Sequence, residues 1–267
     1  MGKSNDFPRF TFSKQFVSFA IFIEYLQIFL YLFKLPENMK FLDILRDFRK
    51  KKDKEPYVPF EVVKSDKGSY EEFYGKLKNT SLILLIVGKR GSGKTSLGMK
   101  FLEFFHNETK SKCYTLGYGD TRLPWWLKKV DSLEKIPNNS IALFDEGAIL
   151  FSARESMKNI NKELSKIMVI ARHKNLTLVL ITQNSAMIDL NVLRLADTLL
   201  LKEPSLLQSD FERKALKDIY LKIKPVFEKI EQKKAHFYVW DDDFQGLLKY
   251  SLPYFWSDKV SKSFKNA

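Results

Sequence analysis

The sequence predicts an α/β fold in which a mainly parallel central sheet is flanked by helices. From residue 81 onward, short and continuous apolar runs alternate with helical patterns, which is typical of parallel strands covered on both faces. A glycine-rich turn joins the first of these runs, Ser81–Val87, to the first helical pattern. Hydrophobic residues make up 45% of the 267 residues and charged residues 29%, so the chain can bury a sizeable core.

The expected strands and helices follow one another along the chain. The expected strands are Ser81–Val87, Lys112–Leu116, Ile141–Phe144, Leu176–Thr182, Thr198–Leu201 and His236–Trp240. The expected helices are Thr95–His106, about Lys158–His173 and a longer one from Leu206 that Pro225 should interrupt, because proline removes a helical hydrogen bond. We therefore expect the main domain over 81–250, followed by a C-terminal tail over 251–267.

Residues 1–38 form an apolar N-terminal segment whose role the sequence leaves open. The stretch 15–34 has the roughly 20 residues that a membrane span needs, but Glu24 and Gln27 lie in its middle. A central carboxylate disfavours insertion by about 2.5–3.5 kcal/mol. Three interpretations remain: a membrane anchor, an amphipathic helix packed on protein, or non-native sequence upstream of a start at Met39.

Residues 39–80 are expected to be a basic linker or arm. Arg46–Lys54 holds six basic residues against two acidic ones, which suits either a solvated linker or an arm that contacts phosphates. Pro56 and Pro59 mark a boundary before the folded domain.

The chain as a whole is strongly basic. Lys and Arg number 45 against 32 Asp and Glu, a formal charge of +13, which favours an anionic partner such as nucleic acid, an acidic membrane surface or nucleotide phosphates. The single cysteine, Cys113, excludes an intramolecular disulfide and a multi-cysteine zinc site. A reducing compartment, the cytoplasm, is therefore expected.

One sequence motif that indicates a chemical function matches its consensus at every position. Gly88–Thr95 reads GKRGSGKT and matches the phosphate loop GxxxxGK[ST] between a buried strand and a helix. The glycines let backbone N–H groups surround phosphate oxygens at a helix N-terminus. Lys94 is expected to bridge the β- and γ-phosphates of ATP, and Thr95 to hold Mg²⁺ through its hydroxyl. The expected nucleotide-binding residues are Gly88, Lys89, Arg90, Gly91, Ser92, Gly93, Lys94, Thr95 and Ser96.

Two later strands end in polar residues that suit the same site. Ile141–Phe144 is followed by Asp145 and Glu146; Asp145 is expected to hold Mg²⁺ and Glu146 to polarise the attacking water as a catalytic base. The strand ending at Thr182 is followed by Gln183, which is expected to sense the γ-phosphate or the water. A strand cap that bonds the next loop is the structural alternative for Gln183.

The succession of these motifs resembles the FtsK–HerA superfamily of RecA-like (ASCE) P-loop ATPases. The resemblance covers about Ser81 to Ser209, and within the superfamily the chain looks most like viral genome-packaging ATPases and Zot-like (zonular occludens toxin-type) ATPases. Membership implies an ATP-driven motor, usually a homo-oligomeric, hexameric ring that moves double-stranded DNA. It implies the ATP and Mg²⁺ roles of Lys94, Thr95, Asp145, Glu146 and Gln183, and it is compatible with a virus- or plasmid-encoded protein.

Alternatives to a DNA motor remain at this stage. A membrane-associated Zot-like ATPase that drives virion assembly or export would use 15–34 as its membrane contact, and a nucleotide-dependent switch would need no processive motion. In a ring, an arginine from the neighbouring subunit would complete the ATP site. The candidates for it are Arg154, Arg172 and Arg194. The pair Trp125–Trp126 suits core or subunit packing, or stacking on bases.

Overall fold

The computed structural model describes residues 57–116, 118, 121–145, 157–182, 190–204, 214–257 and 260. They belong to one compact unit that begins at Pro56 and contains a nine-stranded sheet in the order β1-β9-β8-β7-β2-β6-β5-β3-β4. The strands from β7 to β4 run parallel, whereas β8, β9 and β1 are added antiparallel. This sheet confirms the predicted RecA-like α/β fold.

The parallel strands are the apolar runs that the sequence predicted as strands, together with one shorter strand. Their bounds are β2 Ile83–Val87, β3 Cys113–Leu116, β4 Leu127–Val130, β5 Ile141–Asp145, β6 Thr177–Ile181 and β7 Thr198–Leu201. Every residue of β2, β3, β5 and β6 is buried, because helices cover both faces of the sheet. The antiparallel strands are β8 His236–Trp240, β9 Phe244–Lys249 and β1 Glu61–Gly68.

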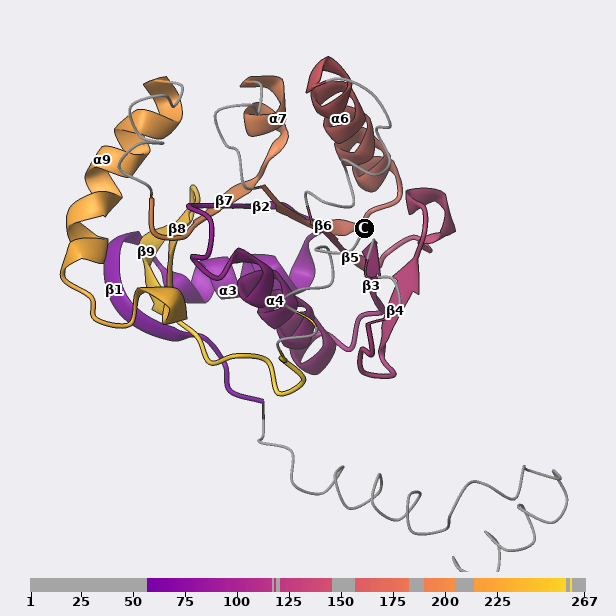
Figure 1. Ribbon diagram of the computed structural model, residues 1–267, viewed down its shortest axis with the longest axis horizontal. Helices are drawn as coiled ribbons and strands as arrows, with labels where there is room; N and C mark the ends of the chain where they lie inside the picture. The colour runs from indigo at the N-terminus through magenta and orange to yellow at the C-terminus, as the bar shows by residue number, and fades with distance from the viewer. Residues whose placement is uncertain are drawn as a thin grey trace, which may run out of the picture. The chain divides into compact units, whose positions relative to one another are not determined.

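Helices lie on both faces of this sheet (Figure 1). One face carries α6 Met157–His173, α7 Leu190–Leu195 and α9 Lys214–Glu228, and the other carries α3 Tyr70–Asn79 and α4 Lys94–Glu108. Each face has its own hydrophobic cluster of buried side chains. The helix α4 approaches the sheet closely at Gly98, where an added Cβ would lie 2.8 Å from side-chain atoms of both Leu143 and Ile181.

The structure differs from the expected linker over 39–80, because Glu61–Gly68 and Tyr70–Asn79 form β1 and α3 within the folded unit. The strand β1 pairs with β9 along its length, yet all of its residues are exposed. Its sequence therefore has no apolar alternation by which it could be predicted.

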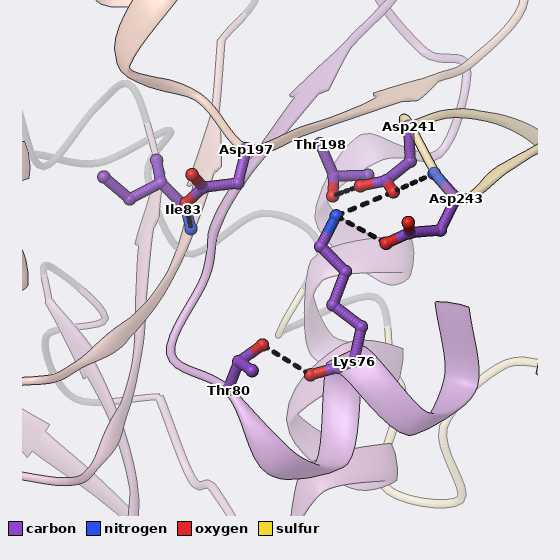
Figure 2. A network of polar contacts seen from close by, with 7 residues as sticks. All are labelled: Lys76, Thr80, Ile83, Asp197, Thr198, Asp241 and Asp243. Carbon is purple, nitrogen blue, oxygen red and sulfur yellow. Dashed lines mark hydrogen bonds and ion pairs between the residues drawn. The ribbon is translucent and has the colours of Figure 1, made fainter. Parts of the chain in front are cut away.

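A network of polar contacts fastens α3 to the sheet (Figure 2). Lys76 on α3 places its Nζ 2.8 Å from Asp241 and 3.0 Å from Asp243. The side chain of Asp241 is fully buried and also accepts a hydrogen bond from the hydroxyl of Thr198, the first residue of β7. Since β8 runs antiparallel to β7, this network lies at the amino ends of β7 and β2.

Two further elements differ from the sequence-based expectation. The strands β4 and β9 were not expected; β4 lies at the edge of the sheet and exposes Lys128 and Lys129. The helix α9 continues through Pro225 and ends three residues later. Pro225 is exposed, so the helical hydrogen bond it removes lies on the solvent side, where water can satisfy the carbonyl.

The described part of the expected C-terminal tail packs on α4. The backbone N–H of Tyr254 donates to Glu103 Oε1 at 3.0 Å, and Glu103 forms a buried ion pair with Lys100, whose Nζ lies 2.5 Å from Glu103 Oε2. Trp126 Nε1 donates to the Tyr254 hydroxyl at 2.8 Å. In the part of the chain that the structure describes, no helix is long and apolar enough to cross a membrane; the stretch 15–34 lies outside that part.

Candidate functional site

The phosphate loop connects the end of β2 at Val87 to the start of α4 at Lys94. Its three glycines all have positive φ angles: 151° at Gly88, 76° at Gly91 and 91° at Gly93. Gly93 caps α4 in a left-handed conformation without a side-chain hydrogen bond. The glycines thus allow the backbone to approach a ligand closely, and the N–H groups and the dipole at the N-terminus of α4 suit an anion.

Lys94 is the buried cation of this loop. Its side chain is 6% exposed, and Nζ donates to the carbonyl oxygens of Gly88 at 2.8 Å and Lys89 at 3.0 Å. The ammonium is therefore held across the loop by its own backbone. This is a suitable place for a charge that binds the β- and γ-phosphates.

Thr95 and Asp145, which are 50 positions apart in the sequence, meet at this site. Thr95 Oγ1 donates to Asp145 Oδ2 at 3.0 Å, and the Asp145 side chain is almost fully buried. The contact arises because the parallel strands β2, β6 and β5 are neighbours, so their carboxyl ends share one edge of the sheet. A hydroxyl and a carboxylate oxygen in contact fit the oxygen ligands that Mg²⁺ prefers.

Two expected site residues, Glu146 and Gln183, lie outside the described residues, so their roles stay predictions. Glu146 directly follows Asp145 in the chain, and Gln183 comes two positions after Ile181, the last residue of β6. Asp145 and Ile181 are register partners in the sheet.

The remaining loop residues have different surroundings. Lys89 forms an ion pair with Glu203, with Nζ 2.7 Å from Oε2, and Arg90 is exposed. The Ser92 hydroxyl is buried without a hydrogen-bond partner in the described part of the chain. Ser96 Oγ donates to the Gly93 carbonyl at 2.9 Å and lies 2.9 Å from the Tyr250 hydroxyl. The Ser96 side chain thus links the end of the loop to Tyr250.

A cleft of about 1470 Å³ opens at the loop. Besides the loop and Asp145, it is lined by residues of the chain before β1, such as Pro59, and after β9, such as Leu252 and Trp256. Segments that the sequence analysis placed in the linker and the tail thus contribute to the same cleft as the phosphate loop.

Lys202 and Tyr250 adjoin the phosphate loop and were missed by sequence reasoning. The signal available for Lys202 was a lysine directly after the apolar run Thr198–Leu201. The pKa of Lys202 is lowered to about 7, mainly by burial and also by the nearby Lys94, while Glu203 opposes this shift. Burial raises the pKa of the Tyr250 phenol to about 12, against a hydrogen bond with Ser96 that lowers it.

Two candidates for the arginine finger fall within the described residues. Arg172 donates to Asp197 Oδ1 and to the Leu195 carbonyl, both at 3.0 Å, and Asp197 also accepts from the Ile83 N–H. Arg172 is thus held at the amino ends of β2 and β7, at the edge of the sheet opposite the loop. Arg194 is exposed on α7, and Arg154 lies outside the described residues.

The two tryptophans of the pair Trp125–Trp126 have different environments. Trp126 is 7% exposed and stacks on His106 with ring centroids 4.3 Å apart. Trp125 is 79% exposed, and Arg122, Lys128 and Lys129, which lie close to it in the sequence, are exposed as well. Core packing therefore accounts for Trp126, whereas Trp125 is an exposed aromatic side chain.

Comparisons with known proteins give structural neighbours only. No known protein family and no curated protein matches the sequence. The chain is similar in structure to the genome-packaging NTPase B204 from Sulfolobus turreted icosahedral virus 2 in complex with ATP-gammaS, with 17% identity and a TM-score of 0.45 over 65% of this chain and 100% of that one. It is also similar to B204, the DNA-packaging ATPase from Sulfolobus turreted icosahedral virus, with 16% identity and a TM-score of 0.46 over 65% and 99%.

A second kind of neighbour is EssC (ATPases 2 and 3) from Geobacillus thermodenitrificans, with 11% identity and a TM-score of 0.43. The match covers 69% of this chain and 42% of that one. At these identities and TM-scores, function has to be argued from the residues of this chain.

Proposed function

We propose that this chain is a Mg²⁺-dependent ATPase of the FtsK–HerA type, an ATP-driven motor that translocates or packages double-stranded DNA. The observation that carries the ATPase part is the contact between Thr95 Oγ1 and Asp145 Oδ2 at 3.0 Å beside the buried Lys94. This contact joins the end of the phosphate loop to a carboxylate on β5, which is separated from β2 by β6. A glycine-rich turn that binds no ligand would not require such a contact.

The chain's own residues divide the chemistry among them. The loop N–H groups and Lys94 bind the phosphates, and Thr95 and Asp145 hold Mg²⁺, which when bound neutralises charge that develops on the phosphates. Glu146 orients the attacking water and takes its proton. Gln183 contacts the γ-phosphate or this water from the end of the neighbouring strand.

The DNA part of the proposal rests on the charge of the chain and on an exposed segment around Trp125. The formal charge of +13 favours a polyanion, and the exposed Trp125 is close in the sequence to the exposed basic residues Arg122, Lys128 and Lys129. Basic side chains bind phosphates without regard to sequence, and an exposed aromatic ring adds a surface for stacking or for packing on sugars. We propose that the working form is a homo-oligomeric ring, six subunits in the superfamily's usual form.

The apolar stretch 15–34 favours the second candidate, a membrane-associated Zot-like ATPase that drives virion assembly or export. The two candidates share the ATP site and differ in what stimulates it. Double-stranded DNA should raise the ATPase rate of the first and leave that of the second unchanged, and membranes should retain the second when soluble protein is washed away.

The test of the ATP site uses two substitutions and one control. Lys94→Ala should weaken both nucleotide binding and turnover, and Glu146→Gln should retain ATP while hydrolysis falls by about 10²–10⁴. Lys78→Ala is the control, because Lys78 lies on α3 and pairs with Glu108, Nζ to Oε2 at 3.7 Å; it should behave like the parent. Hydrolysis at the parent rate by Glu146→Gln would show that another group is the base.

A further inference from the structure

Lys202 follows β7 and is fully buried against the phosphate loop. Its backbone N–H donates to the Val87 carbonyl at 2.8 Å, and its side chain is 0% exposed. A Cβ built on Gly88 would lie 2.6 Å from the Lys202 Cβ. The first residue of the phosphate loop therefore rests directly on Lys202.

The Lys202 ammonium is held by neutral acceptors. Nζ donates to the carbonyl oxygens of Lys234 at 2.7 Å and His236 at 2.5 Å, and to the Tyr250 hydroxyl at 3.4 Å. It also lies 4.8 Å from the centroid of the Tyr250 ring. None of these acceptors is a carboxylate, so burial of the charge is compensated only in part.

Tyr250 continues the chain of hydrogen bonds to the start of α4. Its hydroxyl donates to the Gly93 carbonyl at 3.1 Å and lies 2.9 Å from Ser96 Oγ. Lys202 thus reaches Gly93, the residue that caps α4 beneath the expected phosphates, through one intervening hydroxyl.

The direction of the hydrogen bonds from Lys202 through Tyr250 to Gly93 depends on the charge of Lys202. An ammonium has three hydrogens and can serve both carbonyls and the Tyr250 oxygen, which leaves the Tyr250 hydrogen for Gly93. A neutral amine has two hydrogens and a lone pair. The lone pair then faces the Tyr250 hydroxyl and draws its hydrogen away from Gly93.

The charged groups around Lys202 come from several elements. Glu203 favours the ammonium and Lys94 on α4 opposes it. Glu203 is shared, since its side chain also pairs with Lys89 at 2.7 Å and Lys233 at 3.2 Å. On β8, the His236 ring is turned to another partner, its Nδ1 lying 2.8 Å from the Gln232 carbonyl.

Two pKa shifts agree with this geometry. Burial lowers the pKa of Lys202 to about 7, so that both of its forms are populated near neutral pH. Burial raises the pKa of Tyr250 to about 12, so Tyr250 stays a phenol and keeps its hydrogen.

We propose that Lys202 and Tyr250 are positioning residues of the phosphate loop, and that binding of nucleotide phosphates is accompanied by protonation of those Lys202 amines that are neutral, with the proton taken from solvent. The inference rests on the proposed nucleotide site. Phosphates in the loop compensate the charge of Lys94, which otherwise opposes the Lys202 ammonium, and they add negative charge nearby. The ammonium then directs the Tyr250 hydroxyl to Gly93 and fixes the N-terminus of α4. Because binding linkage is reciprocal, a lower pH must strengthen nucleotide binding.

The expected size follows from the pKa of about 7 in the empty protein. At pH 7 about half of the Lys202 amines are neutral, so binding takes up about half a proton per nucleotide. If Lys202 is protonated in the nucleotide-bound protein at every pH in this range, the affinity for nucleotide falls about tenfold from pH 6 to pH 8. Between pH 7 and pH 8 alone it falls about five-fold.

The experiment is isothermal titration calorimetry of the full chain with Mg²⁺ and the analogue AMPPCP, in pairs of buffers with different ionisation enthalpies. The nucleotide's own titration is common to all variants, so the readout is the difference between parent and Lys202→Met. The parent should take up about half a proton more than Lys202→Met at pH 7. Equal proton uptake by a folded Lys202→Met would overturn the proposal.

Two further variants separate positioning from a structural role. Lys202→Arg stays charged throughout this pH range, so it should retain at pH 8 the affinity that the parent has at pH 6; a pH dependence like that of the parent would contradict the proposal. Tyr250→Phe should weaken binding about five-fold, the value of one hydrogen bond, and lower the proton uptake. Its control is Tyr238→Phe, because the Tyr238 hydroxyl donates to Asp66 Oδ2 at 2.9 Å. This control should change neither the affinity for nucleotide nor the proton uptake.

The outcomes also separate this inference from the proposed function. If the parent binds no nucleotide, both fail. If the parent binds AMPPCP in a Lys94-dependent way but Lys202→Met changes neither proton uptake nor pH dependence, only the inference about Lys202 fails.

Discussion

The close contact between the phosphate loop and Lys202 predicts that three glycine-to-alanine substitutions will change the free energy of unfolding by different amounts. At Gly88, φ is 151°, and an added Cβ would lie 2.6 Å from the Lys202 Cβ and 3.2 Å from its backbone. At Gly91, φ is 76° and nothing lies within 4 Å of an added Cβ. At Gly75, within α3, φ is ordinary and the space is also open.

These three sites separate backbone strain from steric contact. Gly75→Ala should raise the free energy of unfolding by about 0.5–1 kcal/mol, because alanine suits a helix better than glycine. Gly91→Ala should lower it by about 1–2 kcal/mol through backbone strain alone. Gly88→Ala combines strain of about 1–3 kcal/mol with a close contact of about 1–3 kcal/mol, so we expect a loss of about 3–4 kcal/mol.

The assay is urea denaturation followed by circular dichroism, with nucleotide binding measured on the folded variants. Gly88→Ala should also bind nucleotide more weakly, because the loop has to move away from Lys202. If Gly88→Ala is no less stable than Gly91→Ala, the close contact between the loop and Lys202 is not present in the protein.

Three other predictions concern the partner, the buried lysine and the assembly. Binding to double-stranded DNA should be independent of sequence and should weaken steeply with salt, so a flat salt dependence in a filter or fluorescence assay would contradict it. Because the pKa of Lys202 is lowered from 10.5 to about 7 in the folded state, the unfolded chain binds more protons in that window. The free energy of unfolding of the empty protein should therefore rise with pH between 7 and 10, by up to about 1.4 kcal/mol per unit, and an unchanged slope in Lys202→Met would refute this. In mixed rings, Lys94→Ala subunits should rescue an arginine-finger variant such as Arg154→Ala or Arg194→Ala, and full activity of dilute monomers would exclude shared sites.

The central strands could be predicted from sequence because each is an apolar run buried on both faces. The expected runs at Ile141–Phe144 and Leu176–Thr182 agree within one residue at each end with β5 and β6, and Thr198–Leu201 and His236–Trp240 coincide with β7 and β8. The proximity of Thr95 and Asp145 was also expected from the sequence, since the parallel strands of one sheet end at the same edge.

The edges of the sheet could not be predicted in the same way. The strand β1 exposes every residue, and β4 carries two exposed lysines in four residues, so neither shows an apolar run. Both are strands because of the ladder each forms with its inner neighbour. Local pattern carries no record of such a partner.

The support beneath the phosphate loop was missed for a related reason. Lys202 and Tyr250 come from the ends of β7 and β9, more than 100 positions after the loop. They reach it because β7 pairs with β2 and because β8 and β9 continue the sheet from β7. This strand order is a property of the whole fold, and no sequence motif around Lys202 or Tyr250 predicts it.

The most direct test of the proposed motor is the steady-state ATPase rate of the parent and Asp145→Asn, each with and without double-stranded DNA. Asparagine retains the size of Asp145 and can still accept the Thr95 hydrogen bond, so the fold should be preserved while the Mg²⁺ site loses its carboxylate. The account predicts Mg²⁺-dependent hydrolysis by the parent that DNA stimulates and that chelation abolishes, with Asp145→Asn folded and inactive. A folded Asp145→Asn that hydrolyses ATP at the parent rate would contradict it.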